Sequence, residues 1–481
     1  MFEPSLDPCR NRLLTMHTAP MLHDDASCFT HALCFDMLPD AVVRDAQRRI
    51  LDLLGIAAAG TCTRLSAIAR EHALDCFAAG RTPARMLLDG RIVSAAGAAF
   101  AGATTIDSFD GHDGHALTKG HAGVTVLPAL LAMTERAPGM SGREFIVQTV
   151  LGYEIGTRAG IALHATSREY HTSGAWNALA AAAIASRALR FDVSATRHAL
   201  GIAEYHGPRS DMMRCIDHPT MLKDGSGWGA LAGISAALLA SRGYTGAPAT
   251  TAERDAPACW ADLGERWLIL EHYVKPYPVC RWAHPAIAAV LAVRARNGFD
   301  ARVIERVEVE TFHEATRLWS ALPRTTEEAQ YGVLFPVAAA LLHGRVDAGT
   351  IGDAGLADPA VRALMPRLIA KEHAGFSAAF PAERWARVTV ELRDGRRFDS
   401  GAMQASGDHA RPMTPDAERE KFRELTGARF GARFAREVEN AVDALAEPYA
   451  SASALCELVL NAPPVVEDPA LPYTRPVASQ A

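Results

Sequence analysis

Alanine-rich segments with a helical period dominate the first half of the chain, and they restrict the possible folds more than any other property. In residues 38–60, Val42, Val43, Ala46 and Ile50 recur at three- or four-residue steps, the period of an amphipathic helix. The same pattern recurs in residues 93–106, 124–134, 142–164, 175–189, 195–205 and 227–241. Small side chains let helices approach closely, so we expect a tight bundle of helices and turns up to about Leu270.

The pattern changes after His284. Residues 303–312 and 385–398 alternate apolar and charged side chains with period two, and Asp394-Gly395 is a hairpin signal. Helical patterns occupy residues 335–342, 359–370 and 415–461. The sequence therefore predicts a mainly α fold: a large all-helical domain made of residues 1–280 and 411–481, and a smaller α+β lid domain of residues 281–410.

Bulk composition indicates a soluble globular protein. The chain has 481 residues, 49% of them hydrophobic and 22% charged, which is enough for two domains with their own cores. The net charge of −6 would repel nucleic acid and anionic membranes, so we expect neither as a partner. An anionic substrate would need local cations.

Targeting and redox signals point to the cytoplasm. The nine cysteines are scattered without a CxxC pair, which is typical of a reducing compartment. Residues 1–17 carry charges and prolines where a secretion signal needs an apolar stretch, so we interpret them as a loose tail. The longest apolar runs end at Arg187 and Arg242, short of the roughly 20 residues that span a bilayer.

The densest polar cluster lies in residues 107–123, between two apolar helical segments. It contains three carboxylates, three imidazoles and an ammonium, namely Asp107, Asp110, His112, Asp113, His115, Lys119 and His121. A glycine-rich loop held at both ends by packed helices suits acid and base groups that must stay at a fixed distance. The alternative is a solvated loop whose aspartates cap helices.

A second segment, residues 170–176, precedes the alanine-rich helix. Thr172 or Ser173 could cap that helix, whose first amides favour an anion. His171 is equally compatible with a capping partner and with a site residue.

A third segment places Lys223 before a glycine-rich turn and another apolar helix. Its ammonium, with the amides at the helix start, could bind a carboxylate. Arg209 and Arg214 lie upstream and could face the same cavity, although such arginines are more often surface groups.

A fourth segment, residues 273–285, lies where the helical pattern gives way to the mixed one, and domain junctions often line clefts. It carries Lys275, Arg281 and His284. Cys280 and His284 could form a thiol nucleophile with its base, but no other feature resembles a cysteine hydrolase.

Metal binding is the sharpest rival interpretation. The adjacent His112 and Asp113 are similar to the metal-binding His-Asp pair of helical phosphohydrolases. Such enzymes present further ligands from helices, whereas this loop is rich in glycine. We therefore expect no metal.

Taken together, these segments resemble the MmgE/PrpD family, which includes 2-methylcitrate dehydratase, cis-aconitate decarboxylase and iminodisuccinate epimerase. The resemblance covers nearly the whole chain, from LPDAVVRDAQRRILDLLGIAAAG to KPYPVCRWAHPAI and EAQYGVLFPVAAALLHG. It implies a large helical domain with a smaller lid domain, a homodimer, and no metal or organic cofactor.

Five positions match the family's motifs: Asp110, His121, His171, Lys223 and His284 resemble its acidic, imidazole and ammonium positions. The loop departs from the family pattern, with alanine after His121, the additional His112 and His115, and one inserted residue. The run after Lys223 is also different, so the resemblance does not identify the substrate.

The resemblance implies a lyase acting on a small polycarboxylate, with elimination of water as the first expectation and decarboxylation or epimerisation as alternatives. We expect His121, oriented by Asp110, to act as general acid or base, His171 as its counterpart, and Lys223 to clamp a carboxylate. The expected substrate-binding residues are His115, Lys119, Arg209, Lys275, Arg281 and His284. A non-catalytic binding protein is the alternative from another functional class.

Overall fold

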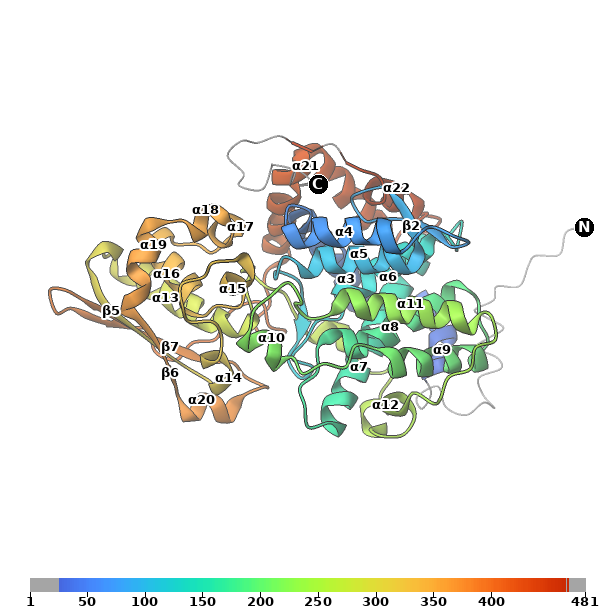
Figure 1. Cartoon of the computed structure of the whole chain (residues 1–481), viewed down its shortest axis with the longest axis horizontal. Coiled ribbons are helices and arrows are strands. Elements are labelled where there is room, and N and C mark those ends of the chain that lie inside the picture. Colours follow the sequence, from blue (N-terminus) through green and yellow to red (C-terminus); the bar gives the residue numbers. More distant parts are fainter. Residues whose placement is uncertain (1–25, 464, 467–481) are drawn as a thin grey trace, which may run out of the picture.

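The computed structural model describes residues 26–463, 465 and 466. The interpretation of residues 1–17 as a tail lies outside the described residues. Figure 1 shows two parts side by side, a larger one built almost entirely of helices and a smaller one that combines helices with a sheet. The fold is therefore mainly α with a smaller α+β part, as the sequence predicts.

The larger part contains the helices that the periodicity predicts and further helices that it does not. Their bounds are α2 (Ala26–Ala32), α3 (Asp40–Gly60), α4 (Arg64–Cys76), α5 (Ala95–Asp107), α6 (Gly123–Thr134), α7 (Gly142–Thr166), α8 (Ser173–Ala188), α9 (Val193–His206), α10 (Met213–Asp217), α11 (Ser226–Ala240) and α12 (Thr250–Glu253). Polar caps define several starts: the side chains of Ser94, Ser141 and Asp192 accept a hydrogen bond from the third amide of α5, α7 and α9.

Helices α8 and α11 pack against each other at unusually close range. A side chain on Gly233 would place its Cβ 2.3 Å from the carbonyl oxygen of Ala178, so only glycine fits there. Nearly every residue of α8 is buried, and α7, α6 and α9 complete its surroundings. Small residues thus give the tight bundle that the alanine content predicts.

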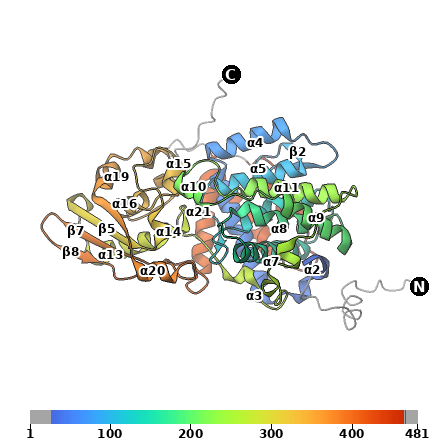
Figure 2. The same ribbon diagram turned by 60° about the horizontal axis from the view of Figure 1, so that its bottom comes forward.

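The end of the chain returns to its beginning. Helix α21 (Pro415–Ala444) packs along α3, and α22 (Ser453–Val459) follows it. Helix α21 bends at Gly431, whose φ of 86° breaks the helical geometry. In Figure 2 the red α21 lies between the smaller part and the blue and green helices.

The smaller part contains a four-stranded sheet with strand order β6-β5-β7-β8. Its elements are α13 (His284–Asn297), β5 (Ile304–Thr311), α14 (His313–Thr316), α15 (Thr326–Gln330), α16 (Leu334–His343), α17 (Ala348–Ile351), α18 (Asp353–Leu356), α19 (Pro359–Leu364), β6 (Leu368–Glu372), α20 (Ala374–Ala379), β7 (Ala386–Leu392) and β8 (Arg397–Asp399). Val307 and Val309 of β5 pair with Val390 and Val388 of β7, and all four are buried. Gly395, with a φ of 85°, supplies the predicted β7–β8 turn.

Some boundaries differ from the sequence prediction. Residues 359–370 are not one helix: α19 ends at Leu364, and Leu368 begins strand β6, which pairs in parallel with β5. Pro366 removes an amide donor at the helix end, and the open edge of β5 supplies partners for the strand that follows. Helix α4, which the sequence analysis did not identify, begins after the Thr63 cap.

Short strands also interrupt the region up to Leu270, which the sequence predicts to be helices and turns. Strands β1 (Pro83–Arg85) and β2 (Ile92–Ser94) pair antiparallel, so α5 starts at Ala95, two residues later than predicted. Within the described residues, no single helix combines the length and apolarity needed to cross a membrane; one pair bent by 91°, α3 with α4, meets those criteria by length and composition alone.

Candidate active site

The polar loop between α5 and α6 is tied to the segment that leads into the smaller part. Strand β3 (Gly114–His115) pairs antiparallel with β4 (His272–Tyr273). The loop is buried rather than solvated, since Asp110, His112 and Asp113 are at most 3% exposed. Two of the four predicted segments therefore meet as one unit.

Asp110 and Lys275 form a buried ion pair at the centre of this unit. The Lys275 ammonium lies 2.6 Å from Asp110 Oδ1 and 3.3 Å from the Asp110 carbonyl oxygen. Burial alone would raise the pKa of Asp110, but Lys275, Lys223 and the histidines nearby hold it well below its usual range. Asp110 is therefore an anion that attracts cations from two other segments.

Gln330 links the smaller part to this pair. It ends α15, and its Oε1 accepts hydrogen bonds from the Asp110 amide at 2.9 Å and from Lys223 Nζ at 2.8 Å. The Lys223 ammonium also lies 4.7 Å from the centre of the Tyr331 ring. An ammonium has three donors, so Lys223 keeps hydrogen-bonding capacity for an anion.

Backbone strain accompanies Lys223. Its φ of 50° lies in the left-handed region that side chains other than glycine seldom adopt, and Gly225 follows with a φ of 67°. Such conformations persist only where the surroundings enforce them, and they gather at functional sites. Here the strained turn directs the 2%-exposed lysine toward Gln330 and the polar loop.

His121 is held in one tautomer. Its Nδ1 lies 2.6 Å from the carbonyl oxygen of Asp113, which can only accept, so Nδ1 carries the proton and Nε2 keeps its lone pair. Burial, the Lys275 charge and His112 hold the pKa of His121 well below its usual value. The ring is therefore a neutral base at pH 7, with Nε2 3.9 Å from Asp224 Oδ2.

Two carboxylates from other segments occupy the starts of α8 and α11. Asp224 Oδ1 accepts the Ser173 amide at 3.0 Å, and Asp107 Oδ2 accepts the Ser226 amide at 3.4 Å. Burial and Asp107 raise the pKa of Asp224. Neither Thr172 nor Ser173 provides the side-chain cap that the sequence allows, because the Thr172 hydroxyl donates to the Pro208 carbonyl oxygen and the Ser173 hydroxyl donates to Asp224.

His112 and Asp113, adjacent in sequence, point into different networks. The Nε2 atom of His112 lies 3.6 Å from Asp107 Oδ1 and 3.7 Å from Asp110 Oδ1. Asp113 Oδ2 instead lies 3.2 Å from His272 Nδ1. The two side chains thus do not act as one metal-binding pair, the arrangement that the phosphohydrolase interpretation requires.

A different trio could hold a cation. Asp110, His112 and His121 each offer a ligand atom within 4.8 Å of the others. Two imidazoles with a carboxylate suit a transition metal. The Lys275 ammonium already lies 2.6 Å from Asp110 Oδ1, however, so a metal there would compete with a buried cation. The expectation of no metal stays a prediction.

Arg281 and His284 lie next to this cluster at the start of the smaller part. Arg281 bonds the carbonyl oxygen of Ser406 at 2.9 Å and pairs with Asp408 at 2.9 Å. His284 Nε2 donates to the carbonyl oxygen of Val279 at 3.0 Å, which leaves Nδ1 to accept from Arg281 at 3.2 Å. These contacts orient the Arg281 guanidinium, which lies 5.0 Å from the Tyr273 ring centre.

The remaining predicted residues lie in other surroundings. His115 Nε2 lies 3.8 Å from Glu271, and burial lowers the His115 pKa to about 4. Arg209 is 45% exposed and lies 3.8 Å from Glu204. Lys119 stacks over Tyr170 at 4.4 Å. These three residues lie outside the Asp110–Lys275–Gln330 contacts.

His171 is close in sequence to Ser173, which bonds to the cluster, but the contacts of the His171 ring lie outside the cluster. Its Nε2 lies 3.4 Å from the Ser167 hydroxyl, and its amide donates to His164 at 3.2 Å. Ser173, two residues on, accepts the His121 amide at 2.9 Å. The assignment of His171 as counterpart to His121 stays a prediction.

Sequence reasoning missed several members of the cluster. Gln330 and Tyr331 belong to the EAQYGVLFPVAAALLHG stretch, whose sequence indicates a helix but no site residue, and Asp224 stands next to the predicted Lys223. Tyr273 lies with its ring centre 6.4 Å from that of His121. The adjacency of Asp224 to Lys223 is a usable signal, whereas Gln330 is the last residue of α15 and has no local sign of function.

Comparisons with known proteins agree with this architecture. The model of the MmgE/PrpD N-terminal domain matches residues 25–261, and that of the MmgE/PrpD C-terminal domain matches residues 277–447. The chain belongs to the MmgE/PrpD family. The gap between the two matches contains Lys275, so the boundary falls beside the candidate site.

Curated relatives match at low identity but over most of their length. A cis-aconitate decarboxylase-like protein of Aspergillus oryzae is 25% identical over 75% of this chain and 82% of its own length. The cis-aconitate decarboxylases of Mus musculus and Homo sapiens are 24% and 26% identical over 82% of this chain, covering 84% and 85% of their own. Two of these relatives are thus named decarboxylases and the third a decarboxylase-like protein.

Proposed function

We propose that this protein is a lyase that acts on a small polycarboxylate at a carbon next to a carboxylate. One observation carries the proposal: the neutral His121, with Nε2 unprotonated, lies in a buried cluster with the ammonium groups of Lys223 and Lys275. Charge that develops beside a carboxylate needs fixed cations, and a proton must be moved at the same carbon.

Decarboxylation is the reaction we propose first, because the curated relatives carry that name. In that reaction the bond between carbon and a carboxylate breaks, CO2 leaves, and the electron pair stays on the substrate next to a second carboxylate. Lys223 then stabilises the negative charge. A proton delivered from His121 Nε2, protonated once the polyanion is bound, ends the step at carbon.

Elimination of water is the second candidate, favoured by the same tautomer. A neutral imidazole with a free Nε2 is suited to removing a proton beside a carboxylate. Asp224, whose pKa is raised, lies 3.9 Å from that nitrogen and could receive the proton next. The leaving hydroxyl also needs a proton, and His171, the proposed counterpart, would have to turn from Ser167 toward the substrate to donate it.

Product analysis separates the two. Purified protein is incubated with cis-aconitate, citrate and 2-methylcitrate, and both released CO2 and the ultraviolet absorbance of a new carbon–carbon double bond are measured. CO2 release supports decarboxylation, and a new double bond without CO2 supports dehydration. Failure to turn over or bind any acid in a wider panel of di- and tricarboxylates would reject the proposal.

Substitution tests the roles. His121→Ala lowers turnover by about 100-fold or more, the usual contribution of a general acid or base. His313→Ala is the matched control, because His313 is an exposed histidine paired with Glu372 in the smaller part. His171→Ala lowers turnover at least tenfold if it is the counterpart. Near-normal turnover of His121→Ala would refute its assignment.

A further inference from the structure

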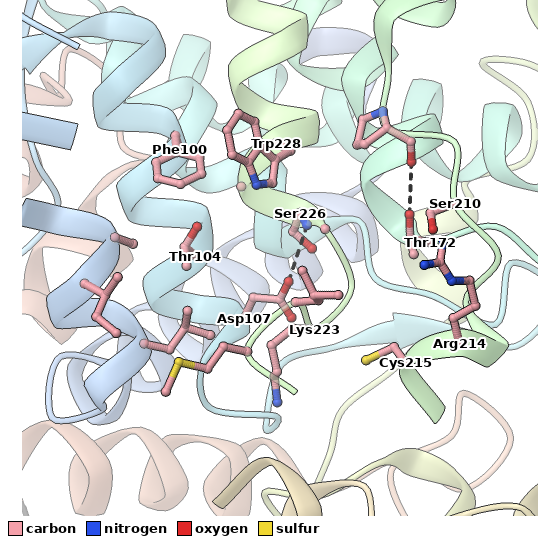
Figure 3. Close-up of a pocket in the computed structure, with 18 of the residues that line it drawn as sticks. Phe100, Thr104, Asp107, Thr172, Ser210, Arg214, Cys215, Lys223, Ser226 and Trp228 are labelled. Atoms are coloured by element: carbon pink, nitrogen blue, oxygen red, sulfur yellow. Dashed lines mark hydrogen bonds between the residues drawn. The ribbon is translucent and has the colours of Figure 1, made fainter. Parts of the chain in front are cut away.

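A largely apolar pocket of about 370 Å³ shares two residues, Lys223 and Asp107, with the polar cluster. It lies between α4, α5 and the start of α11. Figure 3 shows Phe100 and Trp228 together at one end and Asp107 with Lys223 at the other. The pocket therefore joins an apolar compartment to two charged groups at the edge of the candidate active site; Asp110, His121 and Lys275 are not among its lining residues.

The apolar end is open to solvent. Trp228 is 51% exposed and Ile68 48% exposed, while the Trp228 ring packs edge-on against Phe100 with 5.1 Å between ring centres. At the other end, Lys223 and Asp107 are at most 3% exposed. A ligand that entered from the open end would bury apolar surface first and reach charged groups last.

The polar cluster has little use for such a compartment if its substrate consists only of carboxylates. Carboxylates are satisfied by the ammonium groups and gain nothing from Leu65, Ile68 or Phe100. An alkyl or aryl group gains about 25 cal/mol for each Å² of apolar surface removed from water. The two ends of the pocket thus fit the two ends of an amphipathic acid.

We infer that the substrate is a polycarboxylate bearing an apolar arm, whose chain lies between Ile68, Phe100 and Trp228 while its carboxylates meet Lys223. This inference rests on the proposed function for the identity of the polar head. It narrows the substrate class from small acids to alkyl- or aryl-substituted ones.

Binding experiments test the inference without requiring turnover. Isothermal titration compares succinate, 2-propylsuccinate and 2-octylsuccinate, which share two carboxylates and differ only in the chain. Affinity rises about three- to fourfold for each methylene that enters the pocket, so the octyl compound binds at least 30-fold more tightly than succinate. Equal affinities across the series would overturn the inference.

A pocket-filling variant tests where the alkyl group of the ligand binds. Ile68→Trp lowers the gain from the octyl chain at least tenfold, because the larger ring occupies the open end. Ile92→Trp is the matched control: Ile92 is 58% exposed and lies on β2, outside the pocket lining. If both variants reduce the gain from the octyl group equally, the octyl group does not lie in this pocket and the inference is wrong. The inference is also wrong if Ile68→Trp changes only the oligomeric state, because the apolar surface then contacts another copy of the protein.

A further ligand distinguishes this inference from the proposed function. If succinate binds and the alkyl group of 2-octylsuccinate adds no affinity, the proposed polycarboxylate function is supported and the inference of an apolar arm is wrong. If succinate does not bind but octanoate binds, and Ile68→Trp weakens octanoate, the pocket does accept an apolar group but the proposal of a polycarboxylate substrate is wrong. Lys223→Met supports both proposals if it weakens succinate and 2-octylsuccinate by a similar factor and leaves the ratio between the two affinities unchanged.

Discussion

Asp110 and Asp113 lie on the same turn of one loop, yet they belong to regions with different tasks. Both are buried, and both carboxyl groups have a pKa well below the usual range despite that burial. Asp113 faces His272 and Arg49, and Arg49 is itself fixed by Asp45 at 3.0 Å and the His272 carbonyl oxygen at 3.0 Å. All these partners come from the larger part.

Asp110, by contrast, joins segments from both parts. Lys275 comes from the junction and Gln330 from the smaller part, and Gln330 also binds Lys223. The region around Asp113 thus gathers charged groups of the larger part alone, whereas that around Asp110 keeps an ammonium with spare donors and an imidazole with a free lone pair. Equal burial and equal charge therefore do not imply equal roles.

The strongest test of this contrast removes the cation from Asp110. Lys275→Met leaves a buried carboxylate without its partner, which typically costs about 3–5 kcal/mol of unfolding free energy. We also expect turnover to fall about 1000-fold or more. Urea unfolding and steady-state kinetics measure the two effects.

The double variant Asp110→Asn/Lys275→Met separates stability from catalysis. It removes both charges, so most of the lost stability returns, but turnover does not. If Lys275→Met unfolds at the same urea concentration as the parent protein, the Asp110–Lys275 ion pair does not contribute the expected free energy of unfolding.

The reciprocal substitution is Asp113→Asn. It removes the carboxylate that offsets Arg49 and His272, so we expect the free energy of unfolding to fall by about 2–4 kcal/mol. Turnover, measured where the variant is folded, stays within about tenfold of the parent protein. A turnover loss as large as that of Lys275→Met, without loss of stability, would erase the distinction between the two carboxylates.

The pH dependence of stability probes the larger part through Glu154. Burial raises the pKa of this carboxyl to about 7 although Arg158 lies close by. The native state then retains a proton that the unfolded chain releases above its ordinary pKa of 4.5, so stability falls by up to about 3 kcal/mol as pH rises from 4.5 to 7. Glu154→Gln flattens this slope in urea unfolding curves; an unchanged slope would contradict the prediction.

The smallest expected effect concerns Zn²⁺. The Lys275 ammonium lies 2.6 Å from Asp110 Oδ1 and would compete with a metal held by Asp110, His112 and His121. Lys275→Met therefore raises the affinity for Zn²⁺ at least tenfold, measured by titration with a chromophoric chelator. His112→Ala in the same background reverses the gain. Stoichiometric zinc in the unsubstituted protein would show that the ammonium does not protect the cluster.

Most of the secondary structure follows from local patterns. The periodicity of α3 and α7, the alternation in β5 and β7 and the Gly395 turn are properties of neighbouring residues, and these predictions are confirmed. Strand β6 is different, because Leu368–Glu372 is extended only where β5 offers it a parallel partner. Long-range pairing of that kind leaves no periodic signal in a short segment.

The candidate site divides in the same way. The concentration of polar residues in the loop, and the positions of Lys223 and Lys275 where cations are needed, can be read from the sequence alone. Long-range packing pairs Lys275 with Asp110 rather than with Asp113, connects Lys223 to the Asp110 amide through Gln330, and leaves His121 Nε2 free. The physical reason is that each outcome depends on hydrogen bonds between groups far apart in the chain, and no local pattern encodes their geometry.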